Sequence, residues 1–160
     1  MADERVLGKS THAGSLGRRV REARSRAAGG GPRLVNVTDA WLTIPDVAEA
    51  LEVRVTAVHR LLEDRSLVAV RRGPNAVLSV PAAMLMPGRD GTTVVPTLPG
   101  TVQLLVDAGL TDEEIVAWLT TPDASLTWQV GSNRRSGSPL DALRDGHKGE
   151  VRRRAQAFAT

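Results

Sequence analysis

The spacing of apolar residues between positions 43 and 81 constrains this chain more than any other feature of its sequence. Four of them recur at intervals of three and four, the spacing that places side chains on one face of a helix. They are Ile44, Val47, Ala48 and Leu51. Thr43 stands at the N-cap position and Pro45 in the first turn, where a missing N–H costs nothing. The pattern therefore predicts a short amphipathic helix over residues 44–51.

A second apolar set begins soon after the first one ends. It consists of Val55, Val58, Leu61 and Leu62. Two helices this short, joined only by Glu52, Val53 and Arg54, have little length over which to lie antiparallel, so we expect them to cross steeply. A steep crossing of two short helices is helix-turn-helix geometry.

Two β-rich runs follow the second helix. Residues 67–72 and 76–80 flank a Gly-Pro-Asn turn, a pattern that predicts a hairpin with Arg71 and Arg72 at its tip. A hairpin that directly follows a helix-turn-helix is a wing.

The segments WLTIPDVAEALEV and VHRLLEDRSLVAVRR resemble the winged helix-turn-helix of the excisionase and MerR-type group. From position 41 to the end, the chain more closely resembles an actinobacterial family of small DNA-binding proteins. In that family the winged domain is followed by a helical C-terminal domain that ends PLDALRDGHKGEVRRRAQAFA. The family favours Gly, then Val, then Ser or Thr in the turn, where this chain has Glu52, Val53 and Arg54.

These patterns divide the chain into three regions. Residues 1–33 are expected to be a disordered basic tail, because their apolar residues show no period and a Gly-Gly-Gly-Pro run ends them. Residues 34–97 are expected to form the winged helix-turn-helix domain, with a short strand over residues 34–38, and residues 98–160 a C-terminal helical domain. The expected fold class is mainly α with a small β wing.

Within the C-terminal domain we expect a pair of helices, a polar loop and a final helix. Thr111 and Glu114 have the spacing of a capping box at the start of the second helix. Residues 128–138 are rich in Gly, Ser and Asn and are expected to be the loop. The arginine run 152–154 on the last helix is expected to be a solvated face, with Glu150 and Arg154 as an i, i+4 pair.

The net charge of +3 is unevenly distributed. Residues 1–33 hold eight Arg or Lys against three acidic residues, a net charge of +5, while residues 34–90 and 91–160 each have a net charge of −1. Three Trp and one Phe are too few for an aromatic platform on which single-stranded bases stack, so duplex DNA is the favoured partner. The tail is expected to lie on phosphates or in a minor groove, or else to act only as a solubilising leader. The tail arginines assigned to this contact are Arg18, Arg19, Arg21 and Arg24.

Several classes of protein are not supported by the sequence. It has no Cys for a disulfide framework, no apolar run near the length of a membrane span, and no signal peptide, so we expect a cytoplasmic, nucleoid-associated protein. It has no Gly-rich phosphate loop with Lys and no His pair at metal-ligand spacing. We therefore expect neither an enzyme nor a cofactor or metal site.

The candidate DNA-binding residues lie on the outer side of the second helix and on the wing. They are Arg54, Thr56, Ala57, His59 and Arg60, with Arg71, Arg72 and Asn75. Small, neutral or basic side chains in the first part of a helix suit approach to phosphates and base edges. The sequence thus predicts a sequence-dependent double-stranded DNA-binding protein, with regulation of transcription as its role.

The C-terminal half supplies an alternative function. The segments WLTTPDASL and PLDAL resemble, more loosely, the toxin-binding domain of antitoxins of the Xre and ParS type. In that interpretation the chain is a protein-docking adaptor or an antitoxin-like protein, whose C-terminal domain binds a partner protein. Formation of a homodimer is the other use expected of that domain.

Overall fold

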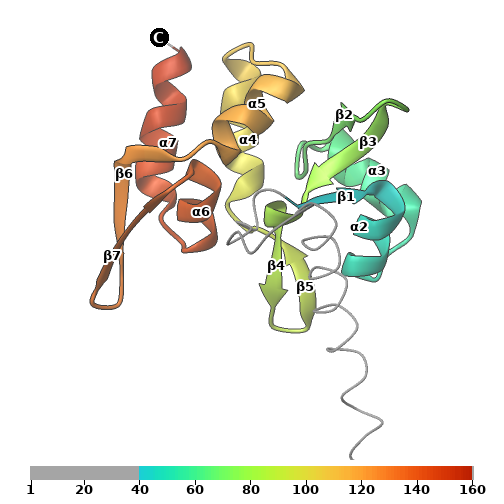
Figure 1. The fold of residues 1–160 in the computed structure, drawn as a ribbon, viewed down its shortest axis with the longest axis horizontal. Helices are drawn as coiled ribbons and strands as arrows, with labels where there is room; N and C mark the ends of the chain where they lie inside the picture. The colour runs from blue at the N-terminus through green and yellow to red at the C-terminus, as the bar shows by residue number, and fades with distance from the viewer. Residues whose placement is uncertain (1–39, 160) are drawn as a thin grey trace, which may run out of the picture.

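The computed structural model describes residues 40–159. The strand predicted over residues 34–38 and the basic tail lie outside this range. The described elements fall into two groups along the longest axis of the molecule (Figure 1). A helix-turn-helix with a small sheet forms one group, and the C-terminal helices form the other.

The first helix of the helix-turn-helix, α2 (Ile44–Leu51), begins at a complete capping box. The Thr43 hydroxyl accepts a hydrogen bond from the Asp46 N–H, and the Asp46 carboxylate accepts one from the Thr43 N–H. Three of the four residues of the predicted apolar face of α2 are buried, and Leu51 at its end is half-buried. α3 (Val55–Glu63) follows it and buries only Val58 fully, while Val55 is 41% exposed rather than turned inward.

The turn between α2 and α3 has a left-handed residue at its first position. Glu52 has φ 57°, and its N–H donates to the carbonyl oxygens of Ala48 and Glu49. This is the position where the resembling family favours Gly, and a side chain there costs about 1–2 kcal/mol. The helix-turn-helix forms despite that cost, because both flanking helices bury apolar faces.

The predicted wing is present as part of a three-stranded antiparallel sheet. Its strands are β1 (Trp41–Thr43), β2 (Val70–Arg72) and β3 (Val77–Pro81), in the order β1-β3-β2. Strand β2 is shorter than predicted, because residues 67–69 pair with no strand and are buried in the core instead.

A second hairpin follows the wing. After η3 (Ala82–Met84), β4 (Leu85–Gly88) pairs with β5 (Gly91–Val94). The sequence of this segment predicts a short helix begun by Pro81, a turn over residues 86–91 and a strand over residues 92–95. The structure has the single 3-10 turn in place of the helix and β5 in place of the strand, whereas β4 begins where the turn was expected.

The C-terminal group contains four α-helices and a hairpin. The helices are α4 (Leu98–Asp107), α5 (Asp112–Thr120), α6 (Pro139–Arg144) and α7 (Lys148–Gln156), and the one-turn η4 (Ala157–Ala159) ends the described chain. The predicted capping box of α5 is present, since Thr111 and Glu114 exchange hydrogen bonds.

The expectation of a purely helical C-terminal domain is wrong. β6 (Asp123–Val130) pairs with β7 (Asn133–Gly137), so most of the predicted polar loop is a β-hairpin and the fold is mixed α/β. Leu126 and Trp128 are buried, whereas the residues that follow each of them, Thr127 and Gln129, are more exposed. This alternation is typical of a strand with one covered face. Gly131, at φ 61°, turns the chain between the two strands.

The two groups share one apolar core and are joined by arginine contacts. Arg144 on α6 donates to the carbonyl oxygens of Ala83 and Leu85, at 2.7 and 2.6 Å. Arg65, which follows α3, forms an ion pair of 2.7 Å with Asp112 at the start of α5. The division of the described chain at residue 97 stays a prediction. Within residues 40–159, no helix has the length and apolarity needed to cross a membrane.

Candidate nucleic-acid interface

The outer face of α3 carries the helix residues that the sequence singled out. Thr56, His59 and Arg60 are exposed, and Ala57 is half-buried at the edge of this face. The opposite face holds the buried Val58, with Leu61 and Leu62 packed against the core. α3 is thus anchored on one side and open on the other.

Arg54 and Arg60 differ from several other arginines in the part of the chain that the structure describes, because no carboxylate there pairs with them. Within the described range, Arg54 and Arg60 are exposed and take part in none of the ion pairs. Arg65 and Arg154, by contrast, are held by carboxylates. Arg54 is also the N-cap residue of α3 and provides no side-chain hydrogen bond to the helix. The acidic residues of α3 and its caps lie at the far end of the helix, at Glu63 and Asp64.

The wing arginines point to opposite faces of the sheet, because they are neighbours on one strand. Arg71 Nη1 donates to the Ala76 carbonyl oxygen at 3.1 Å and so braces the wing turn. The Arg72 guanidinium lies over the Trp41 ring, 4.0 Å from its centre. Asn75 is exposed in the turn itself. The structure therefore brings the α3 residues together on one face but separates the wing pair.

Sequence reasoning did not find the Trp41 contact. Trp41 pairs with Pro81 and Arg72 with Val77, both on β3, so both side chains lie on the same face of the sheet. Only the register of the strands shows that the Trp41 and Arg72 side chains share a face. The sequence did not predict β1 as a strand, so it could not give this register. The four tail arginines assigned to DNA lie outside the described residues.

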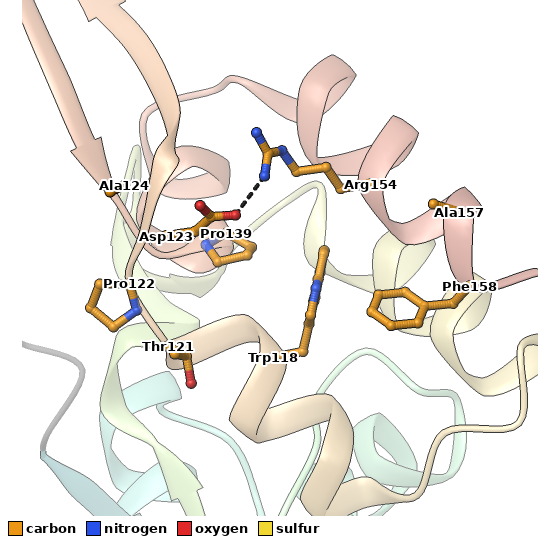
Figure 2. Close-up of a pocket in the computed structure, with 9 residues that line it drawn as sticks. All are labelled: Trp118, Thr121, Pro122, Asp123, Ala124, Pro139, Arg154, Ala157 and Phe158. Carbon is orange, nitrogen blue, oxygen red and sulfur yellow. Dashed lines mark hydrogen bonds and ion pairs between the residues drawn. The ribbon is translucent and has the colours of Figure 1, made fainter.

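The C-terminal group contains an open groove of about 610 Å³ (Figure 2). The rings of Trp118 and Phe158 form one of its walls, with centres 5.9 Å apart and planes at 87°. Arg154 reaches across it to Asp123 at 2.5 Å. Because the Arg154 guanidinium also binds Glu150 and Ser125, the groove offers an apolar wall rather than a free cation.

Asp123, at the rim of this groove, has a perturbed carboxyl group. The Ser125 hydroxyl and N–H both donate to it, and the Arg154 guanidinium lies close by. These donors, the Ser125 hydroxyl first, hold the pKa of Asp123 below its ordinary value. The contacts fasten the start of β6 to α7.

Comparison with known proteins covers both parts of the described chain. Residues 34–85 match a family described as the wHTH domain of DNA-binding protein Rv2175c, and residues 95–159 match the Rv2175c C-terminal domain of unknown function. DNA-binding protein Rv2175c of Mycobacterium tuberculosis is 42% identical over 119 residues, which cover 72% of this chain and 78% of that protein. The chain belongs to the Rv2175c family.

A solved structure supports the same membership. The NMR structure of Rv2175c superimposes with a TM-score of 0.64 at 36% identity, covering 84% of this chain and 90% of that one. The expected resemblance to an actinobacterial family with a winged helix-turn-helix and a C-terminal domain is thereby confirmed at family level. The finer likeness to the excisionase and MerR-type group stays a prediction.

Proposed function

We propose that this chain binds double-stranded DNA in a sequence-dependent manner and regulates transcription. The observation that supports this proposal most strongly is the outer face of α3 with its N-cap. There Arg54 and Arg60 are exposed and form no ion pair with another residue of the described range. Membership of the Rv2175c family supports the proposal, because the relative from Mycobacterium tuberculosis is a DNA-binding protein by name. A DNA-binding protein of this kind works in the cytoplasm, at the nucleoid.

In the proposed docking, α3 enters the major groove. Arg60 or Arg54 donates to guanine O6 and N7, the commonest specific contact of an arginine with a base. Thr56 and Ala57 have small side chains and allow the helix to approach closely. His59 lies on the same exposed side and adds a further polar contact. The carboxylates at the end of α3 stay away from the phosphates.

The wing acts on the DNA backbone or in an adjacent minor groove. Arg72 is stacked on Trp41, which leaves the edge of its guanidinium able to donate to phosphate. Arg71 shares its donors with the Ala76 carbonyl, and Asn75 extends from the turn. The two arginines face opposite ways, so we expect Arg72 to carry more of the phosphate contact than Arg71.

The tail is proposed to add an arm of positive charge. If Arg26 joins the four assigned arginines, so that five clustered arginines meet about five phosphates, log affinity falls with log salt by a slope near −4.5. Removal of residues 1–33 should then flatten that slope. An unchanged slope and affinity after truncation would show that the tail is only a leader.

The C-terminal domain is proposed to mediate association. One winged unit spans few base pairs, so a regulator of this size needs a homodimer, tandem sites or the arm. The apolar wall at Trp118 and Phe158 is the surface that would serve a partner protein in the alternative, adaptor-like function. We infer no catalytic role, and residues 40–159 contain no group of three His, Cys, Asp or Glu side chains arranged to hold a metal ion.

Fluorescence anisotropy with labelled duplexes tests the proposal. Random and genomic fragments are titrated with the full chain at 50 and 200 mM salt. We expect binding that weakens steeply with salt, and a subset of genomic fragments bound more tightly than random DNA. Absence of binding to any fragment at 50 mM salt would contradict the function and favour the adaptor.

A further inference from the structure

Charge in the last 70 residues is sharply segregated along the chain. Residues 91–126 contain five acidic residues and no Lys or Arg, a net charge of −5. Residues 127–160 contain seven Lys or Arg against three acidic residues, a net charge of +4. The near-neutral total of this half therefore hides an acidic part and a basic part.

The basic part presents four cations around the β6–β7 hairpin and α7. They are Arg134, Arg135, Lys148 and Arg153, which we call the distal basic surface. Arg134 and Arg135 are neighbours on β7 and point to opposite faces of the hairpin. Lys148 and Arg153 line a shallow groove of about 360 Å³ together with Thr127 and Trp128. Arg134 lies beside that groove, because its Nη2 donates to Thr127 Oγ1 at 2.9 Å.

Only part of this charge is compensated locally. Arg135 lies 3.4 Å from Asp145, and Arg153 is paired with Glu150 at 2.5 Å. Arg134 and Lys148 take part in none of the ion pairs formed within the described range. Because Arg134 is held by Thr127, one of these uncompensated cations is already oriented.

The supporting structure is rigid. Trp128 is 7% exposed, and its indole N–H donates to Asp145 at 2.7 Å. The same carboxylate accepts from Arg135, so the hairpin is fastened to the end of α6. A cation on such a support loses less conformational freedom on binding than one on a free loop.

The distal basic surface and α3 lie at opposite ends of the molecule. In Figure 1, where the longest axis is horizontal, α3 is at the right and the β6–β7 hairpin at the left, with α4 and the β4–β5 hairpin between them. The acidic start of α5 faces the winged domain, as the ion pair between Arg65 and Asp112 shows. A duplex that crosses α3 at right angles to this longest axis would not reach the hairpin.

We propose that the distal basic surface binds the phosphate backbone of a second DNA duplex, so that one protein bridges two duplex segments. This proposal rests on the proposed function, in which α3 holds the first segment. We expect the second contact to be insensitive to base sequence, because its uncompensated groups are cations, which phosphate oxygens attract whatever the base sequence. Its strength should fall with added salt.

A bridging assay with the full chain tests this directly. A biotinylated duplex is fixed to beads, protein is added, and recovery of a second, fluorescent duplex is measured. The variants are Arg134→Glu, Lys148→Glu and the two combined. Glu at the first turn of α7 suits the helix dipole, so Lys148→Glu should not weaken the fold. Arg89→Glu is the matched control for the two single variants, since Arg89 is an exposed arginine in the turn of the β4–β5 hairpin and the change in charge is the same as in each of them.

We expect the double variant to lower recovery of the second duplex on the order of tenfold, with Arg89→Glu close to the unchanged protein. The affinity of the double variant and of Arg89→Glu for a single duplex, measured by anisotropy, should differ little from that of the unchanged protein. Undiminished bridging by the double variant would overturn the proposal, as would a loss of bridging caused by a lower oligomeric mass in light scattering. Bridging that disappears only when residues 1–33 are removed would assign the second contact to the tail instead. If the unchanged protein bound no single duplex at all, the proposed function itself would fail first.

Discussion

The guanidinium of Arg72 lies over the Trp41 ring, 4.0 Å from its centre, and joins the two outer strands of the wing sheet across β3. An exposed cation–π contact of this kind contributes about 0.5–1 kcal/mol. It leaves the outer edge of the guanidinium open while restricting its movement. We therefore regard Arg72 as a phosphate contact that is oriented before DNA arrives.

Trp41→Leu tests this orientation without altering charge. It should weaken DNA binding about two- to fivefold, corresponding to the loss of about 0.5–1 kcal/mol, and should leave the salt slope unchanged because both wing arginines remain. Anisotropy over a series of salt concentrations measures both quantities. A folded Trp41→Leu protein that binds DNA with full affinity would show that the stacking has no part in binding.

Arg54 occupies a position where stability and DNA binding favour different residues. As the N-cap of α3 it makes no side-chain hydrogen bond, whereas Ser would accept one from the helix. Arg54→Ser should therefore raise the free energy of unfolding by about 1 kcal/mol, and should reduce the salt slope of DNA binding by about 0.9 if Arg54 meets a phosphate. Arg54→Ala is the control, because it removes the same charge and adds no cap. Equal stability of the two variants would contradict this account of the helix start.

The two arginines that join the halves of the molecule should differ in strength. Arg144 is half-buried and donates hydrogen bonds to two backbone carbonyl oxygens, so Arg144→Ala should lower the free energy of unfolding by about 1.5–3 kcal/mol. Arg65 and Asp112 are 38% and 44% exposed, and Arg65→Ala should cost only about 0–1 kcal/mol. Urea denaturation measures both. A larger effect at Arg65 would reverse the assigned order.

The lowered pKa of Asp123 predicts that this carboxyl group makes stability depend on pH only under acidic conditions. A carboxyl whose pKa is lower in the folded state contributes stability above its unfolded value, about 3.9, and that stability is lost as pH falls through the folded pKa. Ser125→Ala removes the hydroxyl that is the largest cause, so the pKa of Asp123 should rise. NMR titration of the side-chain carboxyl measures it. An Asp123 pKa at or above its ordinary value in the unchanged protein would contradict the assignment.

The sequence predicted those elements whose apolar spacing and caps agree. α2, α3 and the wing follow from periods of three and four, from Thr43 at a helix start and from a Gly-Pro-Asn turn. The β6–β7 hairpin was not predicted, because only Leu126 and Trp128 mark its covered face while β7 is polar and exposed throughout. Its exposed polar residues have the composition of a loop.

The candidate site was predictable in part for a similar reason. Exposure of Thr56 and Arg60 follows from helical phase, which the sequence displays. The separation of Arg71 from Arg72 follows from strand alternation, whereas a placement of both at the hairpin tip does not predict it. The distal basic surface combines Arg134 on β7 with Lys148 at the start of α7, and no local pattern reveals that Arg134 lies beside the groove that Lys148 lines.

The central claim is that α3 reads base sequence while the wing holds the backbone. Arg60 lies one turn after Thr56 on the exposed face of α3, so it is placed to meet a base edge. Arg71 and Arg72 lie at the end of β2, where phosphate or sugar is the natural contact. The two sites should therefore respond differently to the same kind of substitution.

The most direct measurement is the ratio of affinities for the preferred site and for random DNA, with circular dichroism to confirm that each variant is folded. Arg60→Ala should cost about 1–3 kcal/mol on the preferred site and little on random DNA, so the ratio falls. Arg71→Ala combined with Arg72→Ala should weaken both by similar factors and reduce the salt slope by up to about two. A ratio that survives Arg60→Ala but is abolished by the wing pair would contradict the account and make the wing the reader.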